Sequence, residues 1–243
     1  LTVEAALYKA LVDKGITPDV TAGLSLGEYG ALIASGAMTM EDAFGVVRKR
    51  GIYMQEAVPT GGAMTAVLGL DPEKIEEICK ETAQKESAVV SIANYNCPGQ
   101  IVITGQKDAV DKAAAACSEA GAKRAVPLKV SGPFHSKMLE GAGEKLGEAL
   151  KDVEIHDIKV PYITNVTADY VASKDDVKDY LKRQVSSSVR WQQTIERLIA
   201  DGADEFIEIG PGRSLAGFMR KINRDVKVVN IDKLEDFEKY VNR

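Results

Sequence analysis

The chain has 243 residues, 45% of them hydrophobic, and its 36 acidic side chains outnumber its 31 basic ones. This length suits one large globular domain or a domain that carries an insertion. The formal net charge of -5 argues against a broad nucleic-acid-binding surface. No apolar run approaches the roughly 20 residues that span a bilayer, and no signal-peptide pattern opens the chain. We therefore expect a cytoplasmic protein with no membrane or nucleic-acid partner.

The first sixty residues combine helices with one short strand. Apolar residues at helical spacing predict two helices, and a β-leaning run between them predicts a strand that ends near Ser25. The helices cover residues 3–14 and 26–35. Thr39, followed three residues later by Asp42, predicts the N-terminus of a third, long helix.

The middle of the chain changes character. Strands are predicted over residues 63–70, 89–94, 100–104 and 123–130, and helices over residues 71–85 and 107–120. The order β-α-β-β-α-β is the ferredoxin-like arrangement. We expect residues 62–130 to form a small ferredoxin-like subdomain inserted into a larger one.

The remaining segments alternate again between helices and strands. Helices are predicted over residues 137–150, 175–184, 191–200 and 233–240, and strands over residues 160–164, 205–209 and 226–231. Such alternation favours a mostly parallel sheet with helices on both faces. Residues 1–61 and 131–243 are therefore predicted to form one α/β domain.

The motif Gly23-Leu24-Ser25-Leu26-Gly27 fits the Gly-x-Ser-x-Gly nucleophile elbow, a sharp turn between a strand and a helix. The two glycines would let the helix pass close to the strand. The backbone N–H of Leu26 would then point to the place where an acyl oxygen becomes negative. An ordinary turn serine is the alternative interpretation.

A nucleophilic serine needs a base, and the chain has two histidines. His135 lies in a turn-rich stretch after a predicted strand, as a catalytic loop would. His156 lies among charged residues in a segment that is typical of a solvated surface. His135 is the better candidate. The three cysteines and two histidines lack metal-ligand spacing, so we expect reduced structural thiols and no metal site.

Six motifs along the chain resemble, in their order, those of the malonyl-CoA:acyl-carrier-protein transacylases. They are Gly23-Leu24-Ser25-Leu26-Gly27, Lys49-Arg50-Gly51, Asn94-Tyr95-Asn96, Gly132-Pro133-Phe134-His135, Asn165-Val166-Thr167 and Glu208-Ile209-Gly210-Pro211-Gly212. The resemblance implies an α/β-hydrolase-like domain with a ferredoxin-like insertion. It also implies transfer of malonyl from malonyl-CoA to the phosphopantetheine thiol of acyl carrier protein. The coenzyme A thioester would be a substrate, and no cofactor would be needed.

The resemblance also implies roles for individual residues. Ser25 would be the nucleophile, His135 its general base and the Leu26 N–H an oxyanion donor. The backbone carbonyl of Gln184 would orient the histidine. The substrate side of the site would include Arg50, Phe134, Gln184 and Asn96.

Two of these residues have a physical rationale and an alternative. The Arg50 guanidinium could grip the malonyl carboxylate through two parallel hydrogen bonds, although an exposed helix arginine would look the same in sequence. Phe134 would fill the space that an α-methyl group needs, or it is a core phenylalanine beneath a loop.

The chain departs from the family pattern in two places. Leu24 stands where many members have histidine, which should alter packing more than chemistry. Family members also carry several tens of upstream residues, with a first strand and a Gly-Gln-Gly loop that supplies a second oxyanion donor. From this we expect the sequence to be part of a longer chain.

Two other classes of function fit the motifs. A serine thioesterase or other hydrolase of the same elbow fold would be expected to provide a carboxylate for its histidine, and the sequence offers no clear candidate. A non-catalytic docking module for acyl carrier protein would leave Ser25 as a turn serine.

Overall fold

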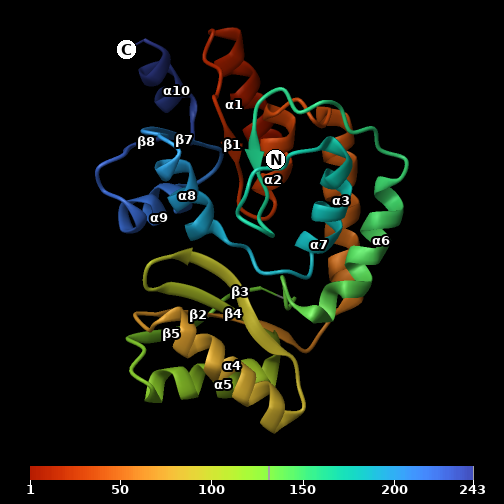
Figure 1. Ribbon diagram of the computed structural model, residues 1–243, viewed down its shortest axis with the longest axis vertical. Coiled ribbons are helices and arrows are strands. Elements are labelled where there is room, and N and C mark those ends of the chain that lie inside the picture. The colour runs from red at the N-terminus through yellow and green to blue at the C-terminus, as the bar shows by residue number, and fades with distance from the viewer. Residues whose placement is uncertain (131, 243) are drawn as a thin grey trace.

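The computed structural model describes residues 1–130 and 132–242. Figure 1 shows helices around short strands in the upper part of the molecule, and a four-stranded sheet with two helices below them. The chain begins with α1 (Thr2–Asp13), β1 (Thr21–Ala22), α2 (Gly27–Ala34) and α3 (Met40–Ala57). These segments confirm the three predicted helices and the strand between them.

Helix α3 begins where the sequence predicts. The Thr39 hydroxyl accepts a hydrogen bond from the Asp42 N–H at 3.1 Å, which satisfies a donor that the helix itself cannot pair. The buried residues of α3 repeat at helical spacing and are Ala43, Val46, Arg50 and Met54. Arg50 therefore faces the interior together with core side chains.

The middle of the chain forms β2 (Gly62–Leu68), α4 (Pro72–Glu86), β3 (Val90–Cys97), β4 (Gln100–Gln106), α5 (Lys107–Glu119) and β5 (Arg124–Pro127). Its strands make one antiparallel sheet in the order β3-β4-β2-β5. α4 and α5 cover one face of this sheet, where Ile75, Ile103 and Val110 are fully buried (Figure 1). On the other face, a cluster that includes Met64 packs against Phe134, so this face closes onto the segment with the predicted base.

Strand β3 runs further than the sequence predicts. The prediction ends it at Asn94, whereas the strand continues to Cys97 and residues 98–99 alone form the turn to β4. The register with β4 is irregular between Ile92 and Asn94 and again between Tyr95 and Cys97. Such bulges interrupt the alternation of buried and exposed side chains along a strand. Because this alternation is the sequence signal for a strand, the predicted strand ends too early.

The last part of the chain forms α6 (Glu140–Leu150), β6 (Tyr162–Ile163), α7 (Val177–Gln184), α8 (Trp191–Ala200), β7 (Glu205–Ile209), α9 (Ser214–Ile222), β8 (Lys227–Ile231) and α10 (Leu234–Val241). Short 3₁₀ turns, Lys137–Leu139 and Lys174–Asp176, precede α6 and α7. In the described residues β1 pairs with β6 and β7 with β8, both in parallel.

The expectation of one mostly parallel sheet is therefore wrong for the part of the chain that the structure describes. The strands outside residues 62–130 are parallel as expected, but they form two separate pairs instead of one sheet. The β1–β6 pair has only two residue pairs, because the chain leaves β1 for the turn at Ser25. The coarser prediction, a mixed α/β fold, is confirmed.

Two apolar cores support the upper part. One joins α2, α3, α6 and α7, and includes the fully buried Tyr29, Leu146 and Leu181. The other joins α8 and α9 to the strand pairs and includes Ile163 and Ile195. Ser25 lies in the turn after β1, between Leu24, which packs against the second core, and Tyr29, which belongs to the first.

Within residues 1–130 and 132–242, no helix is both long and apolar enough to cross a membrane. Cys79, Cys97 and Cys117 are free and buried. The predicted boundary at Ser131 lies outside the described residues.

Candidate active site

Ser25 occupies a strained turn between β1 and α2. Its φ of 53° lies in the left-handed region, which is unfavourable for a residue with a side chain. A Cβ on Gly23 would stand 2.0 Å from the Gly27 carbonyl oxygen, so position 23 requires glycine. The expected clash at Gly27 is wrong, because a Cβ there meets nothing within 4 Å. The backbone of Gly27 therefore lies close to position 23. Of the two glycines, only Gly23 has no room for a side chain.

His135 is within hydrogen-bond distance of Ser25. Its Nε2 lies 2.8 Å from the Ser25 Oγ, and its Nδ1 lies 2.9 Å from the backbone carbonyl oxygen of Gln184. A carbonyl oxygen only accepts, so Nδ1 carries the proton and Nε2 is free to accept from the serine hydroxyl. The two histidines thus differ as expected, since His156 is partly exposed and its ring lies 3.6 Å from Glu154.

Burial makes His135 a base that stays neutral. The side chain is 4% exposed. Desolvation, with a smaller contribution from the positive charge of Arg50, lowers the pKa of His135 from 6.5 to about 4. Backbone hydrogen bonds, including that to Gln184, oppose this shift. The imidazole is therefore unprotonated, and able to accept a proton, throughout the neutral pH range.

Arg50 reaches the same serine from α3. Its Nη2 donates to the Ser25 Oγ at 2.9 Å, and its guanidinium lies 5.8 Å from the centre of the Tyr29 ring. Only 6% of Arg50 is exposed, so the alternative of an exposed helix arginine is wrong. Its Nε has no hydrogen-bond partner among the described residues. A buried guanidinium with donors to spare is suited to bind an anion.

A pocket of about 350 Å³ opens in front of these residues. Its lining comes from the elbow, α3, the four-stranded sheet and the loop of His135, and consists of Leu24, Ser25, Arg50, Gly51, Met54, Gln55, Met64, Asn94, Phe134 and His135. Phe134 is half-buried, lines the pocket and packs against the four-stranded sheet. It is therefore both a wall of the pocket and part of an apolar core. The mixture of apolar walls and one buried cation suits a small acyl group that carries a negative charge.

Two residues predicted for the substrate side lie elsewhere. Asn96 is buried in β3 and is not part of the pocket lining, which includes Asn94 instead. In the pairing of β3 with β4, Tyr95 and Cys97 have partners and Asn96 between them has none. This bulge breaks the two-residue alternation that would otherwise put Asn94 and Asn96 on the same face. Gln184 is fully buried and outside the pocket lining, and its carbonyl holds His135 as the resemblance implies.

The Leu26 N–H is free to act as a donor. Leu26 lies at the N-terminus of α2 with its side chain 38% exposed. The N–H groups on either side of it are both paired, that of Ser25 with Asn165 and that of Gly27 with the Leu24 carbonyl. None of the hydrogen bonds found among the described residues uses the Leu26 N–H.

Sequence reasoning missed two buried polar residues beneath the elbow. Glu28 is fully buried and accepts hydrogen bonds from the Gln184 side chain at 2.8 Å and from the Asn165 N–H at 3.1 Å. Desolvation raises the pKa of Glu28 to about 7, against the effect of these hydrogen bonds. For Glu28, the only sign of a buried role in the sequence is a carboxylate within a mostly apolar helix. For Asn165, the sequence gives no sign beyond the motif in which it stands.

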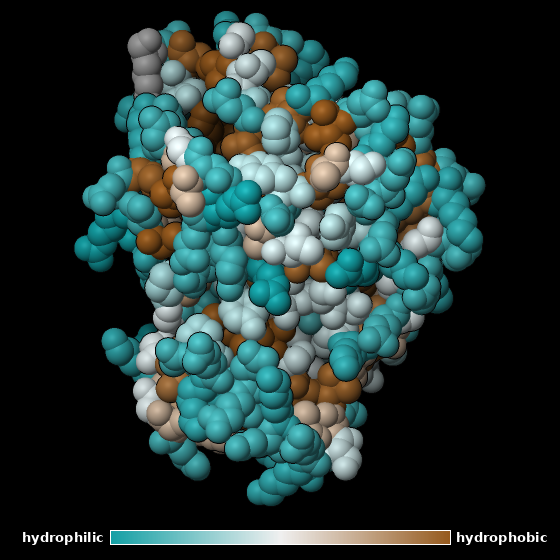
Figure 2. Space-filling view, in the orientation of Figure 1, coloured by the Kyte–Doolittle hydropathy of each residue, from teal (hydrophilic) through white to brown (hydrophobic). Residues whose placement is uncertain are grey.

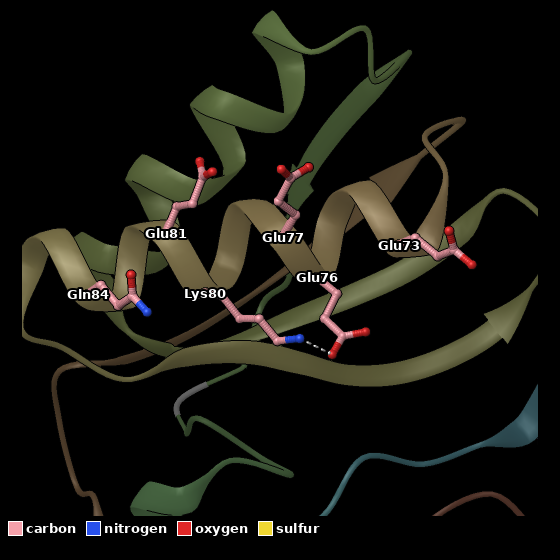
Figure 3. Close-up of a pocket in the computed structure, with 6 residues that line it drawn as sticks. All are labelled: Glu73, Glu76, Glu77, Lys80, Glu81 and Gln84. Atoms are coloured by element: carbon pink, nitrogen blue, oxygen red, sulfur yellow. Dashed lines mark ion pairs between the residues drawn. The ribbon is translucent and has the colours of Figure 1, made fainter.

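A second hollow, of about 400 Å³, runs along α4 far from this chemistry. Figure 3 shows the side chains that line it, which are Glu73, Glu76, Glu77, Lys80, Glu81 and Gln84. Glu76 pairs with Lys80 at 2.8 Å, and Figure 2 shows that the surface over the lower helices is mostly hydrophilic. This hollow lies on the solvent-exposed, polar face of α4. In the described residues, no group of three or more His, Cys, Asp or Glu side chains could hold a metal ion.

Comparison with known proteins gives a consistent answer. Residues 1–231 match the family model of the acyl transferase domain. The malonyl CoA-acyl carrier protein transacylase of Bacillus subtilis strain 168 is 48% identical over 239 residues, which cover 98% of this chain and 75% of that protein. The enzyme of the same name from Staphylococcus aureus strain COL is 45% identical, over 97% of this chain and 76% of its own length.

Solved structures agree with these relatives. The crystal structure of the Streptococcus pneumoniae protein named MCAT superposes with a TM-score of 0.94 at 45% identity, over 99% of this chain and 78% of that one. A malonyl-transacylase solved in complex with a type II polyketide acyl-carrier protein gives a TM-score of 0.95 at 38% identity, over 99% and 78% of the two chains. With the serine, histidine and arginine gathered in one pocket, the chain belongs to the acyl transferase domain family and, within it, to the malonyl-CoA:acyl-carrier-protein transacylases.

Proposed function

We propose that this protein transfers malonyl from malonyl-CoA to the phosphopantetheine thiol of acyl carrier protein, through a malonyl ester on Ser25. The observation that carries the proposal is the convergence on the Ser25 Oγ of a base at 2.8 Å and a guanidinium at 2.9 Å. The first is suited to remove a proton and the second to hold a carboxylate.

The first half-reaction loads the serine. Ser25 gives its proton to the His135 Nε2 as its Oγ attacks the thioester carbonyl carbon. The resulting oxyanion is stabilised by the Leu26 N–H at the start of α2. When the C–S bond breaks, the coenzyme A thiolate takes the proton from His135 and leaves, and malonyl remains on Ser25 as an ester.

The second half-reaction repeats these steps in reverse with a new thiol. The phosphopantetheine thiol gives its proton to His135 and attacks the ester, and the serine oxygen recovers that proton as it leaves. A Ser–His pair oriented by a carbonyl lacks the carboxylate of a full triad. Thioester exchange needs less assistance, because a thiolate is a better leaving group than an amine.

Arg50 selects the acyl group in this scheme. The free carboxylate of malonyl would take hydrogen bonds from the buried guanidinium, which its apolar surroundings make strong. Acetyl offers no such group. Phe134 borders the same pocket and would restrict the space beside the acyl α-carbon, where a methylmalonyl group carries its extra methyl.

The proposal extends to the organisation of the chain. The antiparallel sheet of β2 to β5 with α4 and α5 supports a ferredoxin-like subdomain over residues 62–130, with the α/β-hydrolase-like remainder over residues 1–61 and 131–243. The subdomain supplies Met64 and Asn94 to the pocket wall. A cytoplasmic location and a reaction without a cofactor remain predictions from the sequence.

The test is transfer with and without an acceptor. Purified protein is mixed with malonyl-CoA and either phosphopantetheinylated acyl carrier protein or the carrier without its prosthetic arm, and free malonate and malonyl-carrier are both quantified. We expect malonyl-carrier only with the phosphopantetheine thiol, and little free malonate. Rapid release of malonate independent of the carrier would indicate a thioesterase, and binding of the carrier without turnover would indicate a docking module.

A further inference from the structure

The backbone of Ser25 is held by contacts that the proposed mechanism does not use. With φ at 53°, the residue occupies a conformation that costs roughly 1–2 kcal/mol for an L-amino acid with a side chain. Such strain persists only where the surroundings hold the backbone in place. The direction of the Ser25 Oγ, and with it the 2.8 Å contact to His135, depends on keeping this turn.

Asn165 bonds to the turn on both sides of Leu24. Its Oδ1 accepts from the Ser25 N–H at 2.6 Å, and its Nδ2 donates to the Gly23 carbonyl at 2.6 Å. A backbone N–H only donates and a carbonyl only accepts, so these two bonds require an amide in this orientation. A single planar side chain thereby fixes the two peptide groups on either side of Leu24, and the second of these leads directly into the strained Ser25.

Asn165 is itself rigidly placed. It follows β6, which pairs in parallel with β1, so it lies beside the end of the strand that leads to Ser25. Its N–H donates to the Glu28 carboxylate at 3.1 Å and its carbonyl accepts from the Arg190 N–H at 3.1 Å. The side chain is 1% exposed. All of its polar groups are paired, and three of these bonds reach residues 23–28.

We propose that Asn165 is a positioning residue for the nucleophile. Its side-chain amide holds the turn at Ser25 so that the hydroxyl stays directed at His135. By occupying the Ser25 N–H, it also leaves the Leu26 N–H as the free donor of the elbow. This inference rests on the proposed function, because it concerns the rate at which Ser25 is acylated.

The position of Asn165 predicts a particular kinetic effect. Asn165 does not line the pocket, so its loss should leave the affinity for malonyl-CoA unchanged. It should slow the acylation step, since a displacement of about 1 Å in a reacting group can cost roughly 100-fold in rate. A residue that served only the overall fold would instead lower the melting temperature and the fraction of active protein, without changing the rate of the folded molecules.

The experiment compares Asn165→Ala and Asn165→Asp with the unmodified protein. Aspartate has the same shape and keeps an acceptor for the Ser25 N–H, but it cannot donate to Gly23. Tyr8→Phe is the matched control, because it removes one side-chain bond to the other end of α2, from the Tyr8 hydroxyl to the Ala34 carbonyl at 3.1 Å. Each variant is followed by thermal melting, by single-turnover acylation with malonyl-CoA, and by labelling with a fluorophosphonate, an electrophile that reacts with activated serines.

We expect acylation and fluorophosphonate labelling to slow by about 10- to 100-fold in Asn165→Ala and by a smaller factor in Asn165→Asp, with half-saturation by malonyl-CoA unchanged. Tyr8→Phe should react at the unmodified rate. Acylation at the unmodified rate in either Asn165 variant that melts cooperatively would overturn the inference. Should both variants fail to melt cooperatively, the inference is overturned in favour of a structural role. Unmodified protein that takes the fluorophosphonate but not malonyl would contradict the proposed function and leave the inference standing.

Discussion

In the proposed function, the choice of acyl group depends on Arg50. In Arg50→Ala the malonyl carboxylate would lose its charge-assisted hydrogen bonds, which should cost about 2–4 kcal/mol in kcat/KM for malonyl transfer. Acetyl transfer should fall less or rise, because acetyl has no carboxylate to hold. The comparison of the two acyl-CoA substrates also separates this effect from any disturbance of Ser25, which Arg50 contacts at 2.9 Å.

Arg48→Ala provides a matched control for this variant. Arg48 lies on the exposed face of the same helix, two residues from Arg50. It should transfer both acyl groups at the unmodified rates. If Arg50→Ala slowed malonyl and acetyl transfer by the same factor, Arg50 would be a structural residue and the account of specificity would be wrong.

The low pKa of His135 leads us to expect an unusual pH dependence of kcat/KM. A base must be unprotonated to act, and burial lowers the pKa of His135 to about 4, so protonation of this base should not lower kcat/KM for acylation between pH 8 and about pH 5. A histidine with the ordinary pKa of about 6.5 would already lose half its activity at pH 6.5. The measurement is the pH profile of kcat/KM, which reports groups in the free enzyme.

Glu28 titrates within that window and needs a control. Its pKa is raised to about 7, and it bonds to Gln184, which orients the base. Glu28→Gln removes this titration, so the profile of that variant reports His135 alone. A half-maximal rate near pH 6.5 in both proteins would show that His135 is hydrated in solution, contrary to its burial.

At the residue scale, the sequence predicts the groups that carry out the reaction better than those that support them. Ser25, His135 and Arg50 stand in recognisable motifs, and all three line one pocket. Glu28 and Asn165 act through hydrogen bonds to backbone or side-chain groups up to 156 positions away. Such pairings depend on the tertiary fold, so no local spacing announces them.

The approach of α2 to β1 is the feature of the elbow that a substitution tests best. In Gly23→Ala the new Cβ would lie 2.0 Å from the Gly27 carbonyl oxygen, a clash with backbone that no side-chain rotation relieves. We expect the free energy of unfolding in urea to fall by about 3 kcal/mol or more. Ser25 should also lose its contact with His135.

Gly27→Ala is the matched control for this close approach. A Cβ there meets nothing within 4 Å, and alanine favours a helix over glycine by about 0.5–1 kcal/mol, so stability should be unchanged or slightly higher. Equal stability of the two alanine variants would contradict the geometry of the elbow. A loss confined to Gly27→Ala would do so as well.

At the scale of elements, local chemistry predicts helices well and strands less well. Thr39 and the glycines at 15 and 36 mark helix ends because capping and left-handed turns are decided within a few residues. The end of β3 was missed because bulges break its alternation. Those same bulges determine that Asn94, not Asn96, lines the pocket.

At the scale of the whole molecule, the site lies where two separately packed parts meet. The turn before α2 and helix α3 bring Ser25 and Arg50 from the upper part, while β2 and β3 bring Met64 and Asn94 from the four-stranded sheet. The sequence order predicts both parts. It does not predict how the parallel strands are grouped, because pairing between distant strands depends on long-range packing.

The proposed reaction requires Ser25 to carry the malonyl group as an ester, which an intact-mass measurement after mixing with malonyl-CoA detects. We expect the unmodified protein to gain one malonyl group and to lose it again when phosphopantetheinylated acyl carrier protein is added. Ser25→Ala should gain none and should still melt cooperatively. An adduct of equal yield on Ser25→Ala, or none on the unmodified protein, would contradict the proposed reaction.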